Sequence, residues 1–200
     1  FTFEKIENEF GVIQQTKKIF VNSYPDIPPS AWLLETLSRS ANIPLTTEKA
    51  VSEAIVFPIL QESMYNNTDK AQLFSGEILD SDKKRRLYGE CDYIISLSPQ
   101  SREVRSPILS VLEAKKADIE SPKNQAQNAA QLLGARVFNE QRGRQVPLLF
   151  GACTNGFDWA FLMLQNQTIY VDIDRYSIQN LPKLLGTIDW IIKSSAAAIA

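Results

Sequence analysis

A nearly uninterrupted apolar run, residues 146–154, constrains the fold more than any other feature of the chain. A strand that is apolar at almost every position is typical of a strand buried on both faces of a sheet. The run follows a segment with a helical pattern, residues 122–139, which follows a strand-like run, residues 108–114. A strand, a helix and a strand in this order predict a parallel pair joined by a right-handed crossover. The chain is therefore predicted to be an α/β (α+β) protein.

Further strand patterns surround this unit. We expect strands over residues 72–79 and 93–97, which form a meander with 108–114, and further strands over 159–164 and 168–173. Asn155-Gly156 predicts a type I′ hairpin turn, because both residues tolerate positive φ. The strand that follows this turn should therefore run antiparallel to the apolar strand.

Helical patterns occupy both ends of the chain. We expect helices over residues 3–20, 30–39, 48–65 and 181–199, with Ser30 and either Thr46 or Thr47 as caps. Pro58 should kink the third helix, since proline removes one backbone hydrogen bond. The expected architecture is a mixed central sheet flanked by helices. We assign residues 1–200 to one domain, with a helical N-terminal extension (1–48) and a core (50–164).

The composition narrows the possible chemistry. The chain has no histidine, which excludes triads with a histidine base and three-histidine zinc sites. Any acid–base chemistry must then use carboxylates, lysine, tyrosine or metal-bound water. Cys91 and Cys153 lie far apart in apolar runs without a CxxC spacing. This pattern predicts neither a disulfide framework nor a zinc site, and it indicates a reducing, cytoplasmic compartment.

Charge and hydropathy limit the partners. No stretch approaches the roughly 18 apolar residues of a membrane helix, and the first residues lack a signal-peptide pattern, so we expect a soluble chain without a membrane partner. The net charge of −2 disfavours a protein that coats nucleic acid non-specifically. Lys83-Lys84-Arg85-Arg86 is nevertheless a basic cluster, which fits either a solvated loop or a patch that contacts phosphates.

Two carboxylates and one amine are predicted to meet on neighbouring strands. Asp92 opens the second expected strand, and Glu113 lies near the end of the third. Because side chains alternate along a strand, Lys115 shares the face of Glu113 and Lys116 points to the other face. Two carboxylates about 4 Å apart repel by roughly 4 kcal/mol at an effective dielectric near 20. Such a pair favours a divalent cation, with Glu90 as the main rival to Asp92.

Two helices carry further candidates. Glu53 has apolar neighbours in the helix before the meander, so its charge needs either a metal or an ion pair with Lys49, one turn earlier. On the helix after the meander, Asn124, Gln127 and Gln131 form an amide stripe. Amides donate and accept hydrogen bonds, which suits contact with a carboxylate, a metal-bound water or a phosphate. The alternative is an exposed polar stripe on a surface helix.

The order of these residues resembles the PD-(D/E)XK nuclease superfamily, metal-dependent phosphodiesterases with a restriction-endonuclease-like fold. Cys91 stands where the motif name has proline, and Ala135 stands where many members have tyrosine. Residues 151–161 also resemble the strand, turn and strand in the nuclease region of type I restriction enzymes. The likeness covers residues 50–164, and its matching residues are Glu53, Asp92, Glu113, Lys115 and Gln131.

This resemblance implies a restriction-endonuclease-like core and a hydrolase that cuts phosphodiester bonds in nucleic acid, with DNA as the expected substrate. It implies that Asp92 and Glu113 hold Mg²⁺ or Mn²⁺, with Glu53 and the carbonyl of Ala114 as further ligands. Lys115 would help to lower the pKa of a bound water.

Three interpretations remain open from the sequence. The chain is either an active nuclease, with a partner protein or a second copy adding DNA affinity, or a catalytically inactive module of the same fold that binds protein or nucleic acid. A third interpretation is an unrelated α/β domain in which the acidic-x-Lys triplet is accidental.

Overall fold

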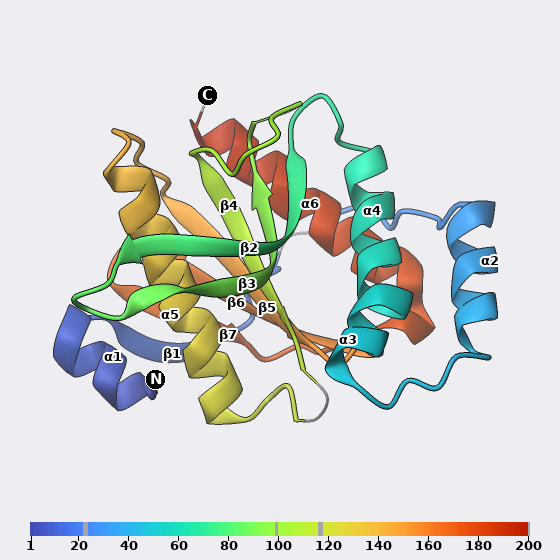
Figure 1. The fold of residues 1–200 in the computed structure, drawn as a ribbon, viewed down its shortest axis with the longest axis horizontal. Coiled ribbons are helices and arrows are strands. Elements are labelled where there is room, and N and C mark those ends of the chain that lie inside the picture. Colours follow the sequence, from blue (N-terminus) through green and yellow to red (C-terminus); the bar gives the residue numbers. More distant parts are fainter. Residues whose placement is uncertain (22–23, 99, 116–117, 200) are drawn as a thin grey trace.

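One mixed sheet organises the molecule. The computed structural model describes residues 1–21, 24–98, 100–115 and 118–199. Within these residues eight strands form a sheet in the order β1-β7-β6-β5-β4-β3-β2, and β8 pairs with β6. Helices α1 and α5 cover one face, and α4 and α6 cover the other (Figure 1). The chain is therefore an α/β protein with a mixed sheet flanked by helices, as its sequence predicts.

The elements have the following bounds. The strands are β1 (Ile13–Lys17), β2 (Gln72–Asp82), β3 (Leu87–Ser96), β4 (Ile108–Ala114), β5 (Leu148–Thr154), β6 (Asp158–Gln165), β7 (Thr168–Asp172) and β8 (Tyr176–Ser177). The helices are α1 (Phe3–Phe10), α2 (Ala31–Ser40), α3 (Glu48–Val51), the π-helix η1 (Ser52–Val56), α4 (Phe57–Tyr65), α5 (Pro122–Glu140), the 3₁₀ helix η2 (Ile178–Asn180) and α6 (Leu181–Ile199).

The predicted meander and crossover are both confirmed. β2, β3 and β4 pair antiparallel in turn, and β4 pairs parallel with β5 across helix α5. β3 differs from the prediction because it begins at Leu87, so Asp92 lies inside the strand and does not open it. The strands β2 and β3 therefore form a longer hairpin than the apolar pattern predicted, with the basic cluster at its turn.

The prediction of one helix over residues 3–20 is wrong in its second half. Helix α1 ends at Phe10, where Gly11 adopts a left-handed conformation with φ of 64° and donates its N–H to the carbonyl of Glu7. Glycine adopts this conformation at no steric cost, so it stops the helix. The next residues form β1, which pairs parallel with β7 at the edge of the sheet. The N-terminal region therefore contains a helix and a strand, and the strand forms only by pairing with β7, which is distant in sequence.

The helix expected over residues 48–65 is three segments in the structure. Thr47 caps it by accepting a hydrogen bond from the N–H of Ala50 at 3.1 Å. A π-helical turn, in which Phe57 donates to the carbonyl of Ser52, precedes Pro58. The missing N–H of the proline consequently falls in the first turn of α4, where a helix tolerates it.

The β5–β6 hairpin is confirmed, but its turn is not type I′. Gly156 has a positive φ of 87°, whereas Asn155 does not. The Asn155 side chain instead accepts hydrogen bonds from the N–H groups of Phe157 and Asp158, at 3.0 and 2.7 Å. A Cβ at position 156 would lie 2.6 Å from Cγ1 of Val51. The turn therefore needs glycine both for its backbone and for contact with α3.

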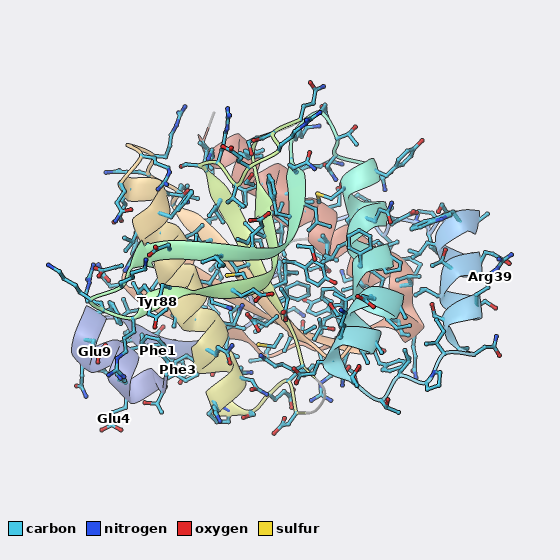
Figure 2. All side chains as sticks on the ribbon, in the orientation of Figure 1. Phe1, Phe3, Glu4, Glu9, Arg39 and Tyr88 are labelled. Atoms are coloured by element: carbon cyan, nitrogen blue, oxygen red, sulfur yellow. The ribbon has the colours of Figure 1, made fainter. Side chains whose placement is uncertain are left out.

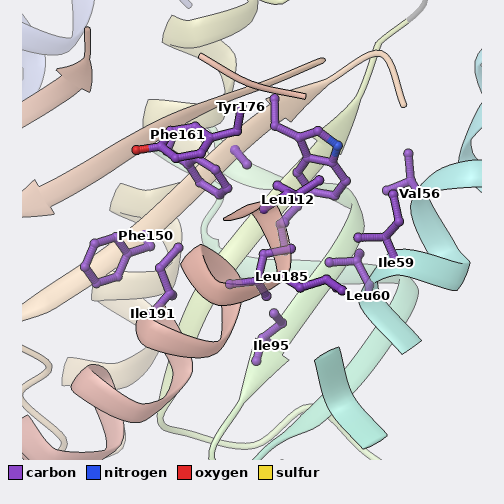
Figure 3. Close-up of a cluster of buried hydrophobic side chains, with 14 of the residues drawn as sticks. Val56, Ile59, Leu60, Ile95, Leu112, Phe150, Phe161, Tyr176, Leu185 and Ile191 are labelled. Atoms are coloured by element: carbon purple, nitrogen blue, oxygen red, sulfur yellow. The ribbon is translucent and has the colours of Figure 1, made fainter. Parts of the chain in front are cut away.

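Two apolar layers hold the helices on the sheet. Figure 3 shows part of the larger layer, where Val56 and Ile59, from η1 and α4, and Leu185, from α6, pack near Leu112 and Phe161 of the sheet. The other layer lies between α5 and the opposite face of the sheet. In the described parts of the chain, no helix combines the length and the apolar character needed to cross a bilayer.

Candidate active site

Asp92 and Glu113 lie side by side on paired strands. The last residue pair of β3 and β4 in register is Tyr93 with Leu112, and the two acidic residues come immediately beyond it. The N–H of Ala114 donates to Oδ2 of Asp92 at 2.7 Å. The carboxylate thus accepts the hydrogen bond that a main-chain carbonyl would accept if the pairing of β3 with β4 continued. The two carboxyl groups are close enough to share a hydrogen bond. The structure thus brings together the two carboxylates that the sequence predicted.

Lys115 completes the predicted trio. Its Nζ lies 2.9 Å from Oε2 of Glu113, and the side chains of Lys115 and Glu113 are only 14% and 4% exposed. Burial alone would lower the pKa of Lys115, but its hydrogen bond to Glu113 and the charges of Glu113 and Asp92 outweigh burial and raise the pKa above its ordinary value. Lys115 therefore carries its positive charge at neutral pH. Lys116 lies outside the described residues.

Gln131 joins the site from the helix that covers it. Its amide Nε2 donates to Oε1 of Glu113. Its amide oxygen accepts a hydrogen bond at 3.2 Å from Nδ2 of Asn128, which also donates to the carbonyl of Val111 at 3.0 Å. The predicted role of Gln131 as a carboxylate contact thus has a geometric basis.

Asn128 also belongs to the site, although the sequence pattern did not indicate it. It is fully buried, and its Oδ1 has no hydrogen-bond partner among the described residues. A Cβ at Gly151 of β5 would lie 2.0 Å from that oxygen, so the glycine makes room for the buried amide. The available signal was an asparagine one turn before Gln131, between the buried alanines 126 and 129.

Both carboxyl groups resist ionisation. Burial raises the pKa of Asp92 above its ordinary value, although the N–H of Ala114 and the charge of Lys115 act in the opposite direction. Burial also raises the pKa of Glu113, and the charge of Asp92 adds to this effect. Two acidic groups that share a site ionise together only when a cation offsets their repulsion.

Glu53 does not join the pair. Its side chain is 67% exposed and lies 3.8 Å from Nζ of Lys49, so the ion-pair alternative describes it. The physical reason is its position on the exposed side of η1, where it pairs with Lys49 one turn earlier. Glu48, the first residue of α3, instead lies close enough to act on the charges of Asp92 and Lys115.

The remaining candidates lie around the pair. Glu90 is exposed on β3, opposite Ile78 of β2. Asn124 donates to the carbonyl of Asp118 at 2.9 Å, which ties the start of α5 to the preceding loop. Cys91 and Cys153 are buried free thiols, and burial raises the pKa of each to about 12. Neither thiol is a nucleophile at neutral pH.

A hollow of about 140 Å³, here named the hairpin pocket, opens between the β2–β3 hairpin and α5. Gln131 lines this hollow and bonds Glu113, so the pocket adjoins the carboxyl pair. The other residues around it are Phe1, Leu79, Arg86, Leu87, Tyr88, Gly89, Glu90, Cys91, Gln127, Ala130 and Gly134.

The donor set suits a hard divalent cation. Among the described residues, no three histidine, cysteine, aspartate or glutamate side chains gather into a metal-binding group. The closely opposed carboxyls of Asp92 and Glu113 nevertheless offer oxygen ligands at a place where one cation, Lys115, faces two acidic groups. Mg²⁺ commonly uses one or two protein carboxylates and keeps several waters. Asp92 and Glu113, with the carbonyl of Ala114, therefore fit Mg²⁺ or Mn²⁺.

Comparison with known proteins adds no relative: no family model, curated protein or solved structure matches this chain.

Proposed function

We propose that this protein is a Mg²⁺-dependent nuclease that hydrolyses phosphodiester bonds in DNA on a restriction-endonuclease-like core. The observation that carries the proposal is the carboxyl pair of half-buried Asp92 and buried Glu113, with Lys115 and Gln131 bonded to Glu113. Asp92 and Glu113 come from two paired strands, Lys115 directly follows the second strand, and Gln131 comes from the helix after it. The free thiols of Cys91 and Cys153 support a reducing, cytoplasmic compartment.

Each side chain has a defined task in this proposal. Asp92 and Glu113 would hold Mg²⁺ or Mn²⁺, which, when bound, supplies Lewis acidity and favours ionisation of a water. Lys115 remains protonated and offsets negative charge on the scissile phosphate, so it acts as a cation and not as a base. Gln131 fixes the orientation of the Glu113 carboxylate through Oε1.

Cleavage of single- and double-stranded DNA in Mg²⁺ and in Mn²⁺ tests this proposal. Glu113→Gln and Lys115→Met should each lower the cleavage rate by roughly a hundredfold or more, as expected when a group that stabilises charge is lost. Glu53→Gln is the matched control, because that exposed glutamate is paired with Lys49, and it should cleave like the parent. A folded parent protein without cleavage of either substrate would sink the nuclease proposal.

The second candidate is a catalytically inactive module of the same fold, which binds a partner protein or nucleic acid. It is favoured by the lack of a third acidic side chain grouped with the pair in the described residues. Calorimetric titration with Mg²⁺ separates the two candidates. Binding that Glu113→Gln abolishes supports the nuclease, whereas no binding at millimolar Mg²⁺ supports the inactive module.

A further inference from the structure

The basic turn of the β2–β3 hairpin contains cations that are paired with carboxylates and cations that are not. Nζ of Lys83 lies 2.6 Å from Asp80, and Nε of Arg85 lies 2.7 Å from Asp82. Lys84 and Arg86 form no ion pair within the described part of the chain. Their charges are exposed, and Arg86 lines the hairpin pocket. Two of the four cations are therefore unpaired among the described residues, and one of them, Arg86, lies at the hairpin pocket.

The pocket is also lined by side chains of the kinds that bind nucleic-acid bases. Tyr88 of β3 is 57% exposed and lines the pocket, and Figure 2 labels it on the hairpin. Gln127 is exposed on the facing side of α5, one turn before Gln131. An aromatic ring stacks on any base, and an amide hydrogen-bonds a base edge or a phosphate. One cation, Arg86, thus lies around the same opening as an aromatic ring and an amide, and Lys84 lies two residues before Arg86 on the turn.

The size of the pocket limits the ligand. Its volume of about 140 Å³ is well below the roughly 300–1,000 Å³ of sites that enclose a whole small molecule. It suits one planar ring, whereas a duplex keeps its bases stacked inside two backbones. An unpaired nucleotide satisfies this limit, and a base-paired one does not.

We propose that the protein binds single-stranded DNA between the β2–β3 hairpin and α5. Arg86 and Lys84 contact backbone phosphates, Tyr88 stacks on one base, and the strand continues past Gln131 to the carboxyl pair. This inference rests on the proposed nuclease function, for which it names the substrate as an unpaired strand.

Binding without cleavage tests the proposal. The probes are a short fluorescein-labelled single-stranded DNA and a blunt duplex of the same sequence, titrated with the full chain in EDTA and followed by fluorescence anisotropy. We expect at least tenfold tighter binding of the single strand. K84Q/R86Q should weaken that binding. The slope of log affinity against log salt concentration should become shallower by roughly 1.4, since each single-strand phosphate contact contributes about 0.7 to that slope.

The matched control is K83Q/R85Q, which removes the same charge from the same turn but from residues already paired with Asp80 and Asp82. It should bind the single strand within about twofold of the parent, and both double variants should melt cooperatively. Tyr88→Ala should weaken binding about fivefold or more through lost stacking. Equal affinity for the duplex, or equal losses in the two double variants, would overturn the proposal.

The outcome is separable from that of the nuclease proposal. Asp92→Asn should lose cleavage, and its affinity for the single strand in EDTA should still fall when the K84Q/R86Q changes are added. Selective binding without cleavage in the parent would reject the nuclease and keep the strand site. If the parent cleaves DNA and K84Q/R86Q binds the single strand as tightly as the parent, the nuclease proposal stands and the proposed strand site is rejected.

Discussion

At the scale of single residues, the carboxyl pair of Asp92 and Glu113 opposes folding when no divalent cation is bound. The pKa values of Asp92 and Glu113 are raised in the folded chain, chiefly by burial. A carboxyl with a raised pKa stabilises the fold while it is protonated, and this contribution is lost as pH rises through its folded pKa. At neutral pH the pair therefore costs stability. Functional sites commonly carry such a cost.

Asp92→Asn should consequently raise the melting temperature at pH 7 in EDTA. An asparagine keeps an acceptor for the N–H of Ala114 and removes one charge from the pair. We expect a gain of several degrees, because about 1 kcal/mol corresponds to roughly 2–4 °C for a domain of this size. The gain should vanish as pH falls below the ordinary carboxyl pKa of about 4. Melting curves between pH 4 and 8 would contradict this account if the variant were equally or less stable throughout.

Addition of Mg²⁺ should stabilise the parent protein and not the Asp92→Asn variant. A cation that binds only the folded state stabilises it by mass action. The melting temperature of the parent should therefore rise with Mg²⁺ at pH 7, and that of Asp92→Asn should stay constant. Calorimetric scans at increasing Mg²⁺ measure this difference, and equal shifts in both proteins would place the cation elsewhere.

At the scale of elements, the contact of α5 with the sheet sets the position of Gln131. Asn128 holds the helix to β4 through the carbonyl of Val111 and orients Gln131 through its amide oxygen. Gly151 of β5 is needed for this approach, since any side chain there meets Oδ1 of Asn128. The helix and both parallel strands thus act together to point one amide at Glu113.

Gly151→Ala should destabilise the fold by about 2 kcal/mol or more, because a close-packed interior tolerates added atoms poorly. Gly134→Ala is the matched control: its Cβ would find no neighbour closer than 3.5 Å, and alanine favours a helix by up to about 1 kcal/mol. Urea unfolding measures both. Similar losses in the two variants would show that Asn128 does not make position 151 special.

Local patterns predicted some elements and failed for others. The bounds of β4 and α6 coincide with the prediction, because apolar periodicity and flanking breaks are contained in each segment. β1 was missed since its five residues are mostly exposed and carry no strand pattern of their own. For the site, strand alternation placed Glu113 and Lys115 on one face, and the expected strand pairing brought Asp92 beside them. That Glu48 and not Glu53 lies near the pair depends on how α3 and η1 pack at the sheet, which no local pattern contains.

At the scale of the whole molecule, stability should fall from the centre of the sheet to its edges. β4 and β5 are buried and paired on both sides, whereas β1 is an exposed edge strand paired only with β7. Hydrogen exchange followed by NMR should show the slowest amides in β4 and β5, and exchange of β1 through local opening. Equal protection of β1 and β4 would indicate a sheet that opens only as a unit.

The pairing of β1 with β7 also bears on how the protein is made. Ile13 pairs with Thr168, so β1 finds its partner only after the strands that lie between them in the sequence have been synthesised. Pairings of such long sequence separation form late, because a large loop must close before any contact rewards it. During synthesis the β1 segment therefore waits unpaired, and the meander with its carboxyl pair can assemble well before the far edge of the sheet exists.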